Sequence, residues 1–544
     1  MIPALLLLAL PLSSQDSALR ETVYLSADRG VYVAGDCMWL SAFCVNASSG
    51  SLSSFSRIAY VELHSAEGTV QTAKIALDGG RGAGNMLIPN TLPTGNYRLF
   101  AYTAQGASVP GFDHLTGART VSVFNTFSTA RIEGGVNVVD EVPEAPEHPS
   151  AGTVRVARPQ PSKLRISNCG PLPVYLSLSV THDDGIPAPQ STLPGSHDSP
   201  ASLEMTSHLA PEYEGEIVRA RVTGTDSAGL ELLAGKYAFM SSPGDGSGVY
   251  TSTIEPDGSV TFVTSNIYGE QDMFLEIEGV DKGNICHLEL QRPFLDLPAE
   301  EIPPLALCYS YAGALSLRAL GMQLENSFND GLATPLPLNR QLIFDPRKSK
   351  SYKLDDYTRF PVMEELFTEF IPEVRIRRQD GKRELQVRAV DPTGNSYFTQ
   401  GTALVLLDGI PVLDHEKILS YDPLLVRRID ISPNAYFLGI RSFRGVVNFV
   451  TYKGTLPGMQ FEDNVRVVTF QGCSLPHAYT CLDAGAGYPD YRQTIFWHPL
   501  IVLAPGETKE LDYKAPDYSG RFLISAEGLD AAGSSVCACS SFTE

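Results

Sequence analysis

The chain has 544 residues, a length that suggests about three to five domains. Its hydrophobic content of 43% is enough for packed cores, and its 47 Gly and 38 Pro residues indicate many turns, as in β-sandwiches. The formal net charge of −21 argues against a dominant basic surface, so nucleic acid and anionic membranes are disfavoured as partners.

The N-terminus carries an apolar stretch, IPALLLLALPL at residues 2–12, that is too short to span a bilayer. Small residues follow it at Ser13 and Ser14, so we expect a signal peptide over 1–15, although no Lys or Arg precedes the stretch. A core helix is the alternative. No other stretch is long and apolar enough for a transmembrane helix, and we expect an exported protein.

Nine cysteines are present, and export would permit disulfides. Cys37 and Cys44 lie on one predicted strand at an odd spacing, so their side chains face opposite ways and cannot pair with each other. Cys473 and Cys481 could pair across a loop. The remaining pairings stay open.

The first domain is expected over 21–125, where short strands alternate with Gly and Asp turns, as in a β-sandwich. Its opening is similar to the macroglobulin-like domain of the alpha-2-macroglobulin family. The matching residues are Tyr24, Asp28-Arg29, Tyr32, Gly35-Asp36 and Trp39. The resemblance implies either an interaction module or a structural sandwich.

Members of that family trap proteases through a thioester between Cys and Gln in a C-G-E-Q motif. This chain has Tyr268 in place of the thiol, followed by Gly269, Glu270 and Gln271. No thioester can form there, so we read the segment as a turn.

The middle of the chain is expected to form further sandwiches. Residues 126–163 are acidic and Pro-rich, a composition typical of a linker. Residues 164–293 predict one or two β-sandwiches, and their strands resemble the regulatory-like sandwich found beside carboxypeptidases. Residues 294–345 predict a connecting helix and a linker, because apolar residues recur at helical spacing over 307–325.

Residues 346–470 predict a small α+β domain. Apolar runs at 404–407 and 410–413 flank Asp408-Gly409, a turn signal, and so predict a hairpin. Asp414 and Asp422-Pro423 can each start a short helix, and 428–432 and 446–452 predict strands.

The sequences LVLLDGIPV, ILSYDPLLVRRIDI and YFLGIRSFRGVVNFVTYKG in this region resemble the plug domain of TonB-dependent outer-membrane receptors. An unrelated α+β domain is the alternative. A sandwich is expected over 471–544. The predicted fold class is therefore mainly β and multidomain, with several Ig- or macroglobulin-like β-sandwiches and one small α+β plug-like domain.

Candidate interaction residues cluster in the plug-like region. Four arginines could meet an acidic partner, and two aromatic residues could contact a protein or ligand. The candidates are Asp408, Gly409, Arg427, Arg428, Tyr436, Phe437, Arg441 and Arg444. Arg375, Arg377 and Arg378 alternate in a predicted strand, where they would either guard an edge against aggregation or form a docking patch.

No catalytic or cofactor-binding motif is expected from the sequence, because it lacks the H-E-x-x-H, G-x-S-x-G and P-loop patterns. The residues His182-Asp183-Asp184 and His197-Asp198 could be written as a metal site. They lie beside Pro- and Gly-rich loops, so we expect solvated side chains and no metal.

A TonB-dependent receptor needs a barrel of about twenty-two strands, but only 90 residues follow Gly454 in this sequence. We therefore expect a non-catalytic exported cell-envelope protein, periplasmic or associated with the outer membrane. It would act as a scaffold or docking partner of an outer-membrane barrel or transport complex. The alternatives are a glycan- or peptide-binding module and the plug-bearing part of a TonB-dependent uptake system.

Overall fold

The computed structural model describes residues 20–108, 118–143, 152–189, 212–244, 248–265, 267–280, 286–295, 301–328, 333–336, 349–379, 381–390, 395–398, 401–438, 441–479, 491–514 and 518–544. These residues are mainly β-strand and form two compact units, each discontinuous in sequence. The first unit combines 1–215, 294–338 and 473–544, and the second combines 216–293 and 339–472. The predicted signal peptide at 1–15 lies outside the described residues. Within those ranges, no helix has both the length and the apolar character needed to span a bilayer.

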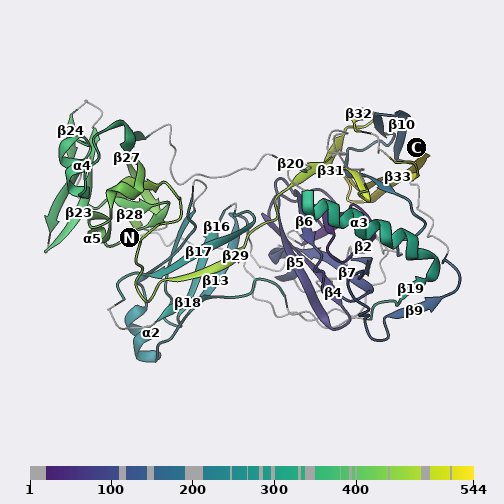
Figure 1. Cartoon of the computed structure of the whole chain (residues 1–544), viewed down its shortest axis with the longest axis horizontal. Coiled ribbons are helices and arrows are strands. Elements are labelled where there is room, and N and C mark those ends of the chain that lie inside the picture. Colours follow the sequence, from purple (N-terminus) through teal and green to yellow (C-terminus); the bar gives the residue numbers. More distant parts are fainter. Residues whose placement is uncertain are drawn as a thin grey trace, which may run out of the picture. The chain divides into compact units, whose positions relative to one another are not determined.

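The first unit begins with the sandwich predicted at 21–125 (Figure 1). Its strands pair antiparallel except β2 and β8, which are parallel. One sheet has the order β1 (Glu21–Ala27), β3 (Cys37–Asn46), β6 (Arg81–Leu87); the other has β2 (Val31–Val33), β8 (Arg119–Phe124), β7 (Gly95–Tyr102), β4 (Ile58–Ser65), β5 (Gly68–Ala76). A short helix, α1 (Ala104–Ser108), follows β7. Alternate side chains of both sheets fill one core, in which Leu40, Val61 and Leu99 are fully buried.

A second sandwich in this unit joins strands from both ends of the chain. β12 (Val174–His182) pairs antiparallel with β31 (Thr494–Leu503) on one side and with β33 (Arg521–Asp530) on the other. The remaining strands are β34 (Ser535–Thr543), β30 (His477–Tyr479) and β20 (Ala333–Pro335) in that sheet, and β10 (Val154–Gln160), β11 (Lys163–Asn168) and β32 (Thr508–Asp512) in the facing one. The strands predicted at 471–544 therefore share one sandwich with strands from 154–182 and with β20.

The segment 126–163, predicted as a linker, holds two strands. β9 (Val136–Val139) pairs in parallel with β19 (Leu305–Cys308), and β10 pairs with β11. Val154 and Val156 are buried while Arg155 between them is exposed, the period of two expected of a strand. The acidic, Pro-rich composition around 140–149 concealed this alternation, and the linker assignment is corrected accordingly.

The helix predicted at 307–325 is observed as α3 (Ala312–Phe328), preceded by the single turn η2 (Tyr309–Tyr311). It contacts β2 of the first sandwich. Met322 and Tyr311 are buried there beside Val31 and Val33. The helix therefore covers one end of the first sandwich and is part of its packing.

The second unit contains a sandwich and an α+β subdomain. The sandwich has the sheets β16 (Ser259–Thr264), β13 (Glu216–Thr223), β18 (His287–Leu290) and β15 (Val249–Thr253), β14 (Tyr237–Ser241), β17 (Glu270–Ile277), β29 (Arg466–Gln471). Helix α2 (Ser227–Leu233) is capped by the Asp226 carboxylate, which accepts a bond from the Gly229 amide. Since β29 pairs with β17, residues 466–470 belong to this sandwich and not to the predicted 346–470 domain.

The α+β subdomain spans residues 350–456 and has its own core, including Leu385, Leu407 and Phe449. Its main sheet has the order β21 (Lys350–Lys353), β27 (Val426–Leu438), β28 (Arg441–Thr451), β25 (Leu404–Leu407), β26 (Ile410–Pro411). A second sheet has β22 (Val374–Gln379), β23 (Lys382–Val390), β24 (Ser396–Phe398). The short helices are η4 (Leu354–Asp356), α4 (Met363–Glu369), α5 (His415–Leu419) and η5 (Pro423–Leu425).

Local signals account for the start of two of these helices. The Asp414 carboxylate caps α5 by accepting a bond from the Glu416 amide, and Asp422 caps η5 by accepting one from Leu424. Pro423 occupies the first position of η5. Both caps are confirmed. Across the core, Arg383 of β23 ties α4 to α5 through ion pairs with Glu364 and Glu416.

Candidate functional site

The turn Asp408-Gly409 joins β25 to β26 as a two-residue hairpin. Leu407 pairs with Ile410, and both turn residues have positive φ, 48° at Asp408 and 86° at Gly409. Positive φ at both central positions is the pattern of a type I′ turn, which Asp-Gly favours because both residues tolerate the left-handed region. The predicted hairpin is confirmed.

Asp408 is itself 3% exposed, and its carboxylate organises the surrounding backbone. One oxygen accepts a hydrogen bond from the Thr451 amide at 2.7 Å. The other accepts bonds from the Thr451 hydroxyl at 2.7 Å and the Leu456 amide at 2.9 Å. Asp408 thus anchors the loop that follows β28. Gly409 is also buried, so these two predicted interaction residues lie inside the subdomain and not on its surface.

The four predicted arginines do not form one cluster. Arg428 lies across from Val450 in the ladder between β27 and β28, whereas Arg444 lies across from Ala435. At about 3.3 Å per residue, these two positions are roughly 20 Å apart along the hairpin. Arg427 is exposed, and Arg428 forms an ion pair with Asp430 at 2.9 Å. The sequence did not indicate how long this hairpin is. Its length separates Arg427 and Arg428 from Arg441 and Arg444.

The far end of this hairpin carries the two predicted aromatic residues. Phe437 is 67% exposed. Tyr436 is half-buried against Phe239 and Phe443, and burial raises its pKa to about 12. Only Phe437 of this pair is available to a partner as a free aromatic surface.

Arg441 fixes the end of the hairpin within the second unit. Its guanidinium pairs with the Glu278 carboxylate and lies 5.4 Å from the centre of the Tyr237 ring and 4.9 Å from that of Phe443. An arginine held between a carboxylate and two rings is a packing element. Its role is to hold the hairpin against the neighbouring sandwich.

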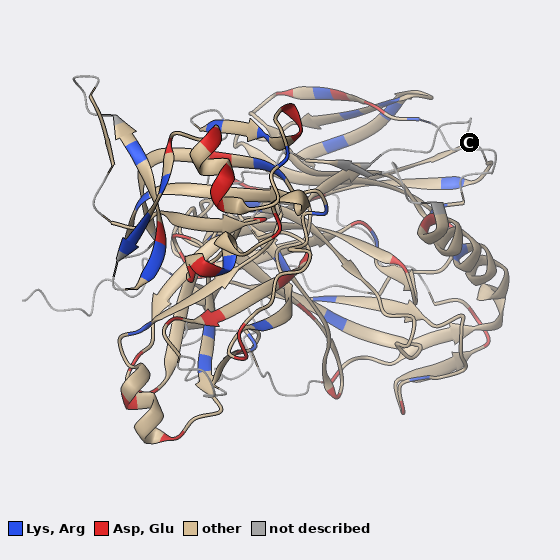
Figure 2. Ribbon diagram, turned by 60° about the vertical axis from the view of Figure 1, so that its left-hand side comes forward, with Lys and Arg blue, Asp and Glu red and all other residues tan. Residues whose placement is uncertain are grey.

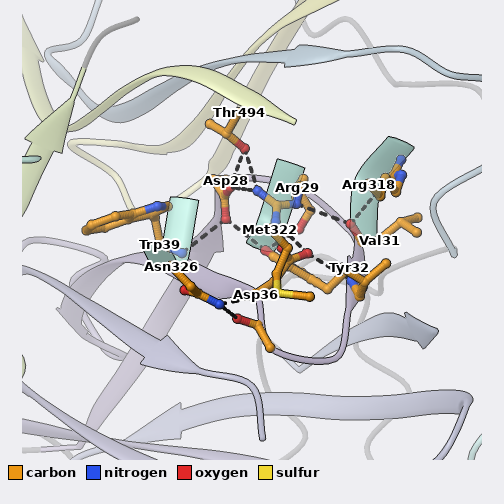
Figure 3. A network of polar contacts seen from close by, with 12 residues as sticks. Asp28, Arg29, Val31, Tyr32, Asp36, Trp39, Arg318, Met322, Asn326 and Thr494 are labelled. Carbon is orange, nitrogen blue, oxygen red and sulfur yellow. Dashed lines mark hydrogen bonds and ion pairs between the residues drawn. The ribbon is translucent and has the colours of Figure 1, made fainter. Parts of the chain in front are cut away.

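The first unit holds a polar network built on the macroglobulin-like residues (Figure 3). One Asp28 oxygen accepts bonds from the Trp39 amide at 3.0 Å and the Tyr32 hydroxyl at 2.8 Å. The Arg29 guanidinium pairs with Asp28 at 2.9 Å and with Asp36 at 2.8 Å. The Asp36 carboxylate also accepts a bond from the Val33 amide. The motif therefore closes the two turns that connect β1, β2 and β3.

Helix α3 and the C-terminal strands complete this network. The Arg29 guanidinium donates to the hydroxyl of Thr494, at the start of β31. The Asn326 amide donates to the Gly35 carbonyl at 3.0 Å, and Arg318 donates to the Val31 carbonyl at 2.7 Å. Burial raises the pKa of Glu325 to about 7, against the opposing effect of Arg29. The network joins the first sandwich, α3 and the second sandwich, so its role is structural.

Asp184, one of the residues considered for a metal site, is paired with Arg318. The two guanidinium bonds measure 2.6 and 2.9 Å. Burial would raise the pKa of Asp184, but the bonds and charge of Arg318 outweigh it and lower that pKa. His197 and Asp198 lie outside the described residues, and no group of potential metal ligands occurs within the described ranges. Arg318 was missed because nothing in a helical leucine-rich stretch points to a buried ion pair.

The cysteines give one clear outcome. Cys37 and Cys44 lie seven residues apart on β3, so their side chains point to opposite faces of the strand. Both are free thiols, as expected. The predicted partner of Cys473, Cys481, lies outside the described residues.

A search of protein-family models finds no match to the chain, and a search of curated proteins also finds none. Among solved structures, trypsin-activated alpha-2-macroglobulin from Escherichia coli aligns at 8% identity with a TM-score of 0.22, over 97% of this chain and 42% of that chain. Salmonella alpha-2-macroglobulin reacted with methylamine aligns at 9% identity and a TM-score of 0.22, over 96% and 39%. An Escherichia coli adhesin aligns at 12% identity and a TM-score of 0.14, over 48% and 60%.

This chain spans about two fifths of the length of the two alpha-2-macroglobulins. The chain's own strands make it a mainly β protein of several sandwiches with one α+β subdomain at 350–456.

Proposed function

We propose that this is a non-catalytic exported protein of the cell envelope, periplasmic or associated with the outer membrane, that serves as a scaffold or docking partner. Its sandwiches act as spacers, and its α+β subdomain, which resembles a TonB-dependent receptor plug, contacts a protein partner. That partner is an outer-membrane barrel or transport complex.

The observation that carries the proposal is the β27–β28 hairpin of the plug-like subdomain. Its base is tied into the core through Asp408, its end is fixed by Arg441, and Phe437 stays exposed beside that fixed end. An exposed aromatic residue is a common anchor of protein interfaces, because aromatic side chains are enriched there. The macroglobulin-like residues support the same proposal, since Asp28, Arg29 and Asp36 are engaged in closing the turns of the first sandwich.

Affinity purification tests this proposal. The tagged protein is recovered from gently cross-linked, detergent-solubilised envelopes, once as the full chain and once with residues 350–456 deleted. We expect an envelope protein to be retained by the full chain and lost with the deletion. Recovery of no envelope protein, or equal recovery by the deletion variant, would contradict the proposal.

A glycan- or peptide-binding module is the second candidate. Tyr357 is 42% exposed and stacks on Phe370 with ring centres 4.4 Å apart, a platform on which a sugar or aromatic side chain could rest. Binding of a glycan or peptide array that Tyr357→Ala abolishes and that Phe437→Ala leaves unchanged would favour this alternative. The third candidate, the plug-bearing part of a TonB-dependent uptake system, would require that uptake of a ligand depend on this chain.

A further inference from the structure

The outward face of the sheet β22–β23–β24 carries a concentration of basic side chains. In this sheet Arg375 lies across from Gln386, Arg377 from Glu384 and Arg388 from Phe398. Residues opposite one another in an antiparallel ladder share a face. The basic face, as we define it, consists of Arg375, Arg377, Lys382, Glu384, Gln386, Arg388, Ser396 and Phe398. The opposite face, with Val374, Leu385 and Val387, is buried in the subdomain core.

The charge of this face contrasts with that of the chain. Four of its side chains are basic and one, Glu384, is acidic, in a protein whose formal net charge is −21. The strands of this sheet stand out in blue at the left of Figure 2. Arg377 and Lys382 are exposed. The face is therefore a positively charged surface on a protein with a net negative charge.

Two of the arginines are held in place by their neighbours. The Arg375 guanidinium lies 4.1 Å from the centre of the Phe398 ring, and that of Arg388 lies 5.1 Å from the same ring. The side-chain oxygen of Gln386, which is 1% exposed, accepts two bonds from Arg375 at 3.1 and 2.9 Å. A guanidinium fixed in this way loses less side-chain entropy when it binds a carboxylate.

The surroundings of the face suit an extended peptide. Among the described strands, β24 is the terminal one of its sheet, and an outer edge of this kind can accept a further strand. Gly401, whose carbonyl lies 3.5 Å from the Gln386 side-chain nitrogen, lies under Arg444: a Cβ at Gly401 would be 3.0 Å from the Arg444 side chain. The aliphatic part of the Arg444 side chain therefore lies next to Gly401, which borders the face.

We propose that the basic face binds an acidic segment of a protein partner; this rests on the proposed function, in which the plug-like subdomain docks to a protein. Arginine forms paired hydrogen bonds to a carboxylate, and the face presents several basic groups across a sheet about 10 Å wide. A duplex nucleic acid or an anionic bilayer would extend well past these eight residues, in a chain that carries 62 acidic and 41 basic side chains. A short acidic segment would stay within about one screening length of the basic groups.

The test uses the purified full chain and a fluorescently labelled oligo-glutamate peptide, with binding followed by anisotropy at increasing NaCl. The variant R377Q/K382Q removes two exposed charges and leaves the Arg375–Phe398–Gln386 arrangement intact. The matched control, K453Q/R466Q, removes one Lys and one Arg that are exposed elsewhere in the second unit. Circular dichroism establishes that both variants are folded.

We expect salt-sensitive binding of oligo-glutamate that R377Q/K382Q weakens by about threefold to tenfold and that K453Q/R466Q leaves within twofold, roughly the range for exposed ion pairs. Binding no stronger than that of a neutral Gly-Ser peptide, or equal losses in both variants, would overturn the inference. Tighter binding of duplex DNA or phosphatidylglycerol vesicles to the same face would also overturn it. An envelope protein that binds through 350–456 and is retained equally by R377Q/K382Q would overturn the inference about the basic face. The proposed function would still hold in that case.

Discussion

Asp408 shows how one side chain can set both a turn and the position of a distant loop. Its φ of 48° lies in a region that costs most residues about 1–2 kcal/mol and that Asp tolerates better. Its carboxylate also accepts three hydrogen bonds from Thr451 and Leu456. Asp is suited to this position because it satisfies both requirements.

Replacing Asp408 by Ala should destabilise the α+β subdomain by about 3 kcal/mol, because the three bonds are lost and left-handed strain is added. Asp408→Asn is the matched control, since Asn accepts the same φ and keeps one acceptor oxygen. We expect it to lose about 1–2 kcal/mol, measured by urea unfolding. Equal losses in both variants would mean that the carboxylate is not the anchor.

His415 gives the subdomain a pH dependence with a defined sign. The imidazole Nδ1 accepts a hydrogen bond from the Leu385 amide at 3.0 Å, and burial lowers the His415 pKa to about 4. A histidine whose pKa in the folded state lies below its unfolded value near 6.5 favours folding in the neutral form. Its contribution is complete above about pH 6.5 and is lost as the pH falls toward 4, a total of about 3 kcal/mol.

The difference in unfolding free energy between the wild-type protein and His415→Gln should therefore shrink by about 3 kcal/mol between pH 7 and pH 4. Other groups that titrate in this range act in both proteins and cancel in the difference. If the two proteins lose stability in parallel, the imidazole is not held neutral in the native state.

At the scale of single elements, the crossing of β28 over β23 depends on Gly445. This glycine has a φ of 100°, and a Cβ added there would lie 2.6 Å from the Val387 Cβ. The β28 main chain can approach β23 closely at this point because Gly445 has no side chain. The sheet β22–β23–β24 can therefore pack against the main sheet. The long β27–β28 hairpin also bends here, where the pairing register shifts between Ser432 and Ala435.

Gly445→Ala should cost about 3 kcal/mol, from left-handed strain together with the overpacking against Val387. Gly454→Ala is the control, because Gly454 also has a positive φ, 65°, but a Cβ there meets open space. We expect it to cost about 1 kcal/mol. The midpoints of thermal unfolding are compared between the two variants. Indistinguishable midpoints would show that the contact with β23 is unimportant.

The elements that sequence reasoning found are those whose signals are local. The Asp408-Gly409 hairpin, the caps at Asp414 and Asp422, and α3 all depend on residues close together in the chain. The β27–β28 hairpin was found only in part: strands were predicted at 428–432 and 446–452, but its length was not. That length separates Arg428 from Arg444, so the predicted arginine cluster was wrong.

For the whole molecule, the main feature is that each compact unit is assembled from separate parts of the sequence. β12 lies between β31 and β33, which follow it by more than three hundred residues. Strand pairing over such a distance leaves no local pattern, because each strand alternates in the same way whichever partner it has. The linear domain boundaries predicted at 164, 293 and 471 could not have revealed it.

Deleting β33 and β34, residues 521–543, should therefore disrupt the second sandwich although β10–β12 are intact. Phe522 and Ile524 would leave the core that they share with Leu176 and Val180. We expect hydrogen exchange of 174–182 to rise to the rate of an unfolded chain, while exchange of 404–407 and 446–451 is unchanged. Retained protection of 174–182 would show that β12 folds without its C-terminal partners.

We propose that the α+β subdomain at 350–456 docks to a protein partner, and site-specific photo-cross-linking in living cells tests this most directly. A photoreactive phenylalanine analogue is placed at position 437, whose side chain is 67% exposed, and for comparison at position 309, which is 86% exposed on the first unit. We expect a discrete adduct with one envelope protein from position 437 and not from position 309. No adduct at position 437, or the same adducts from both positions, would contradict it.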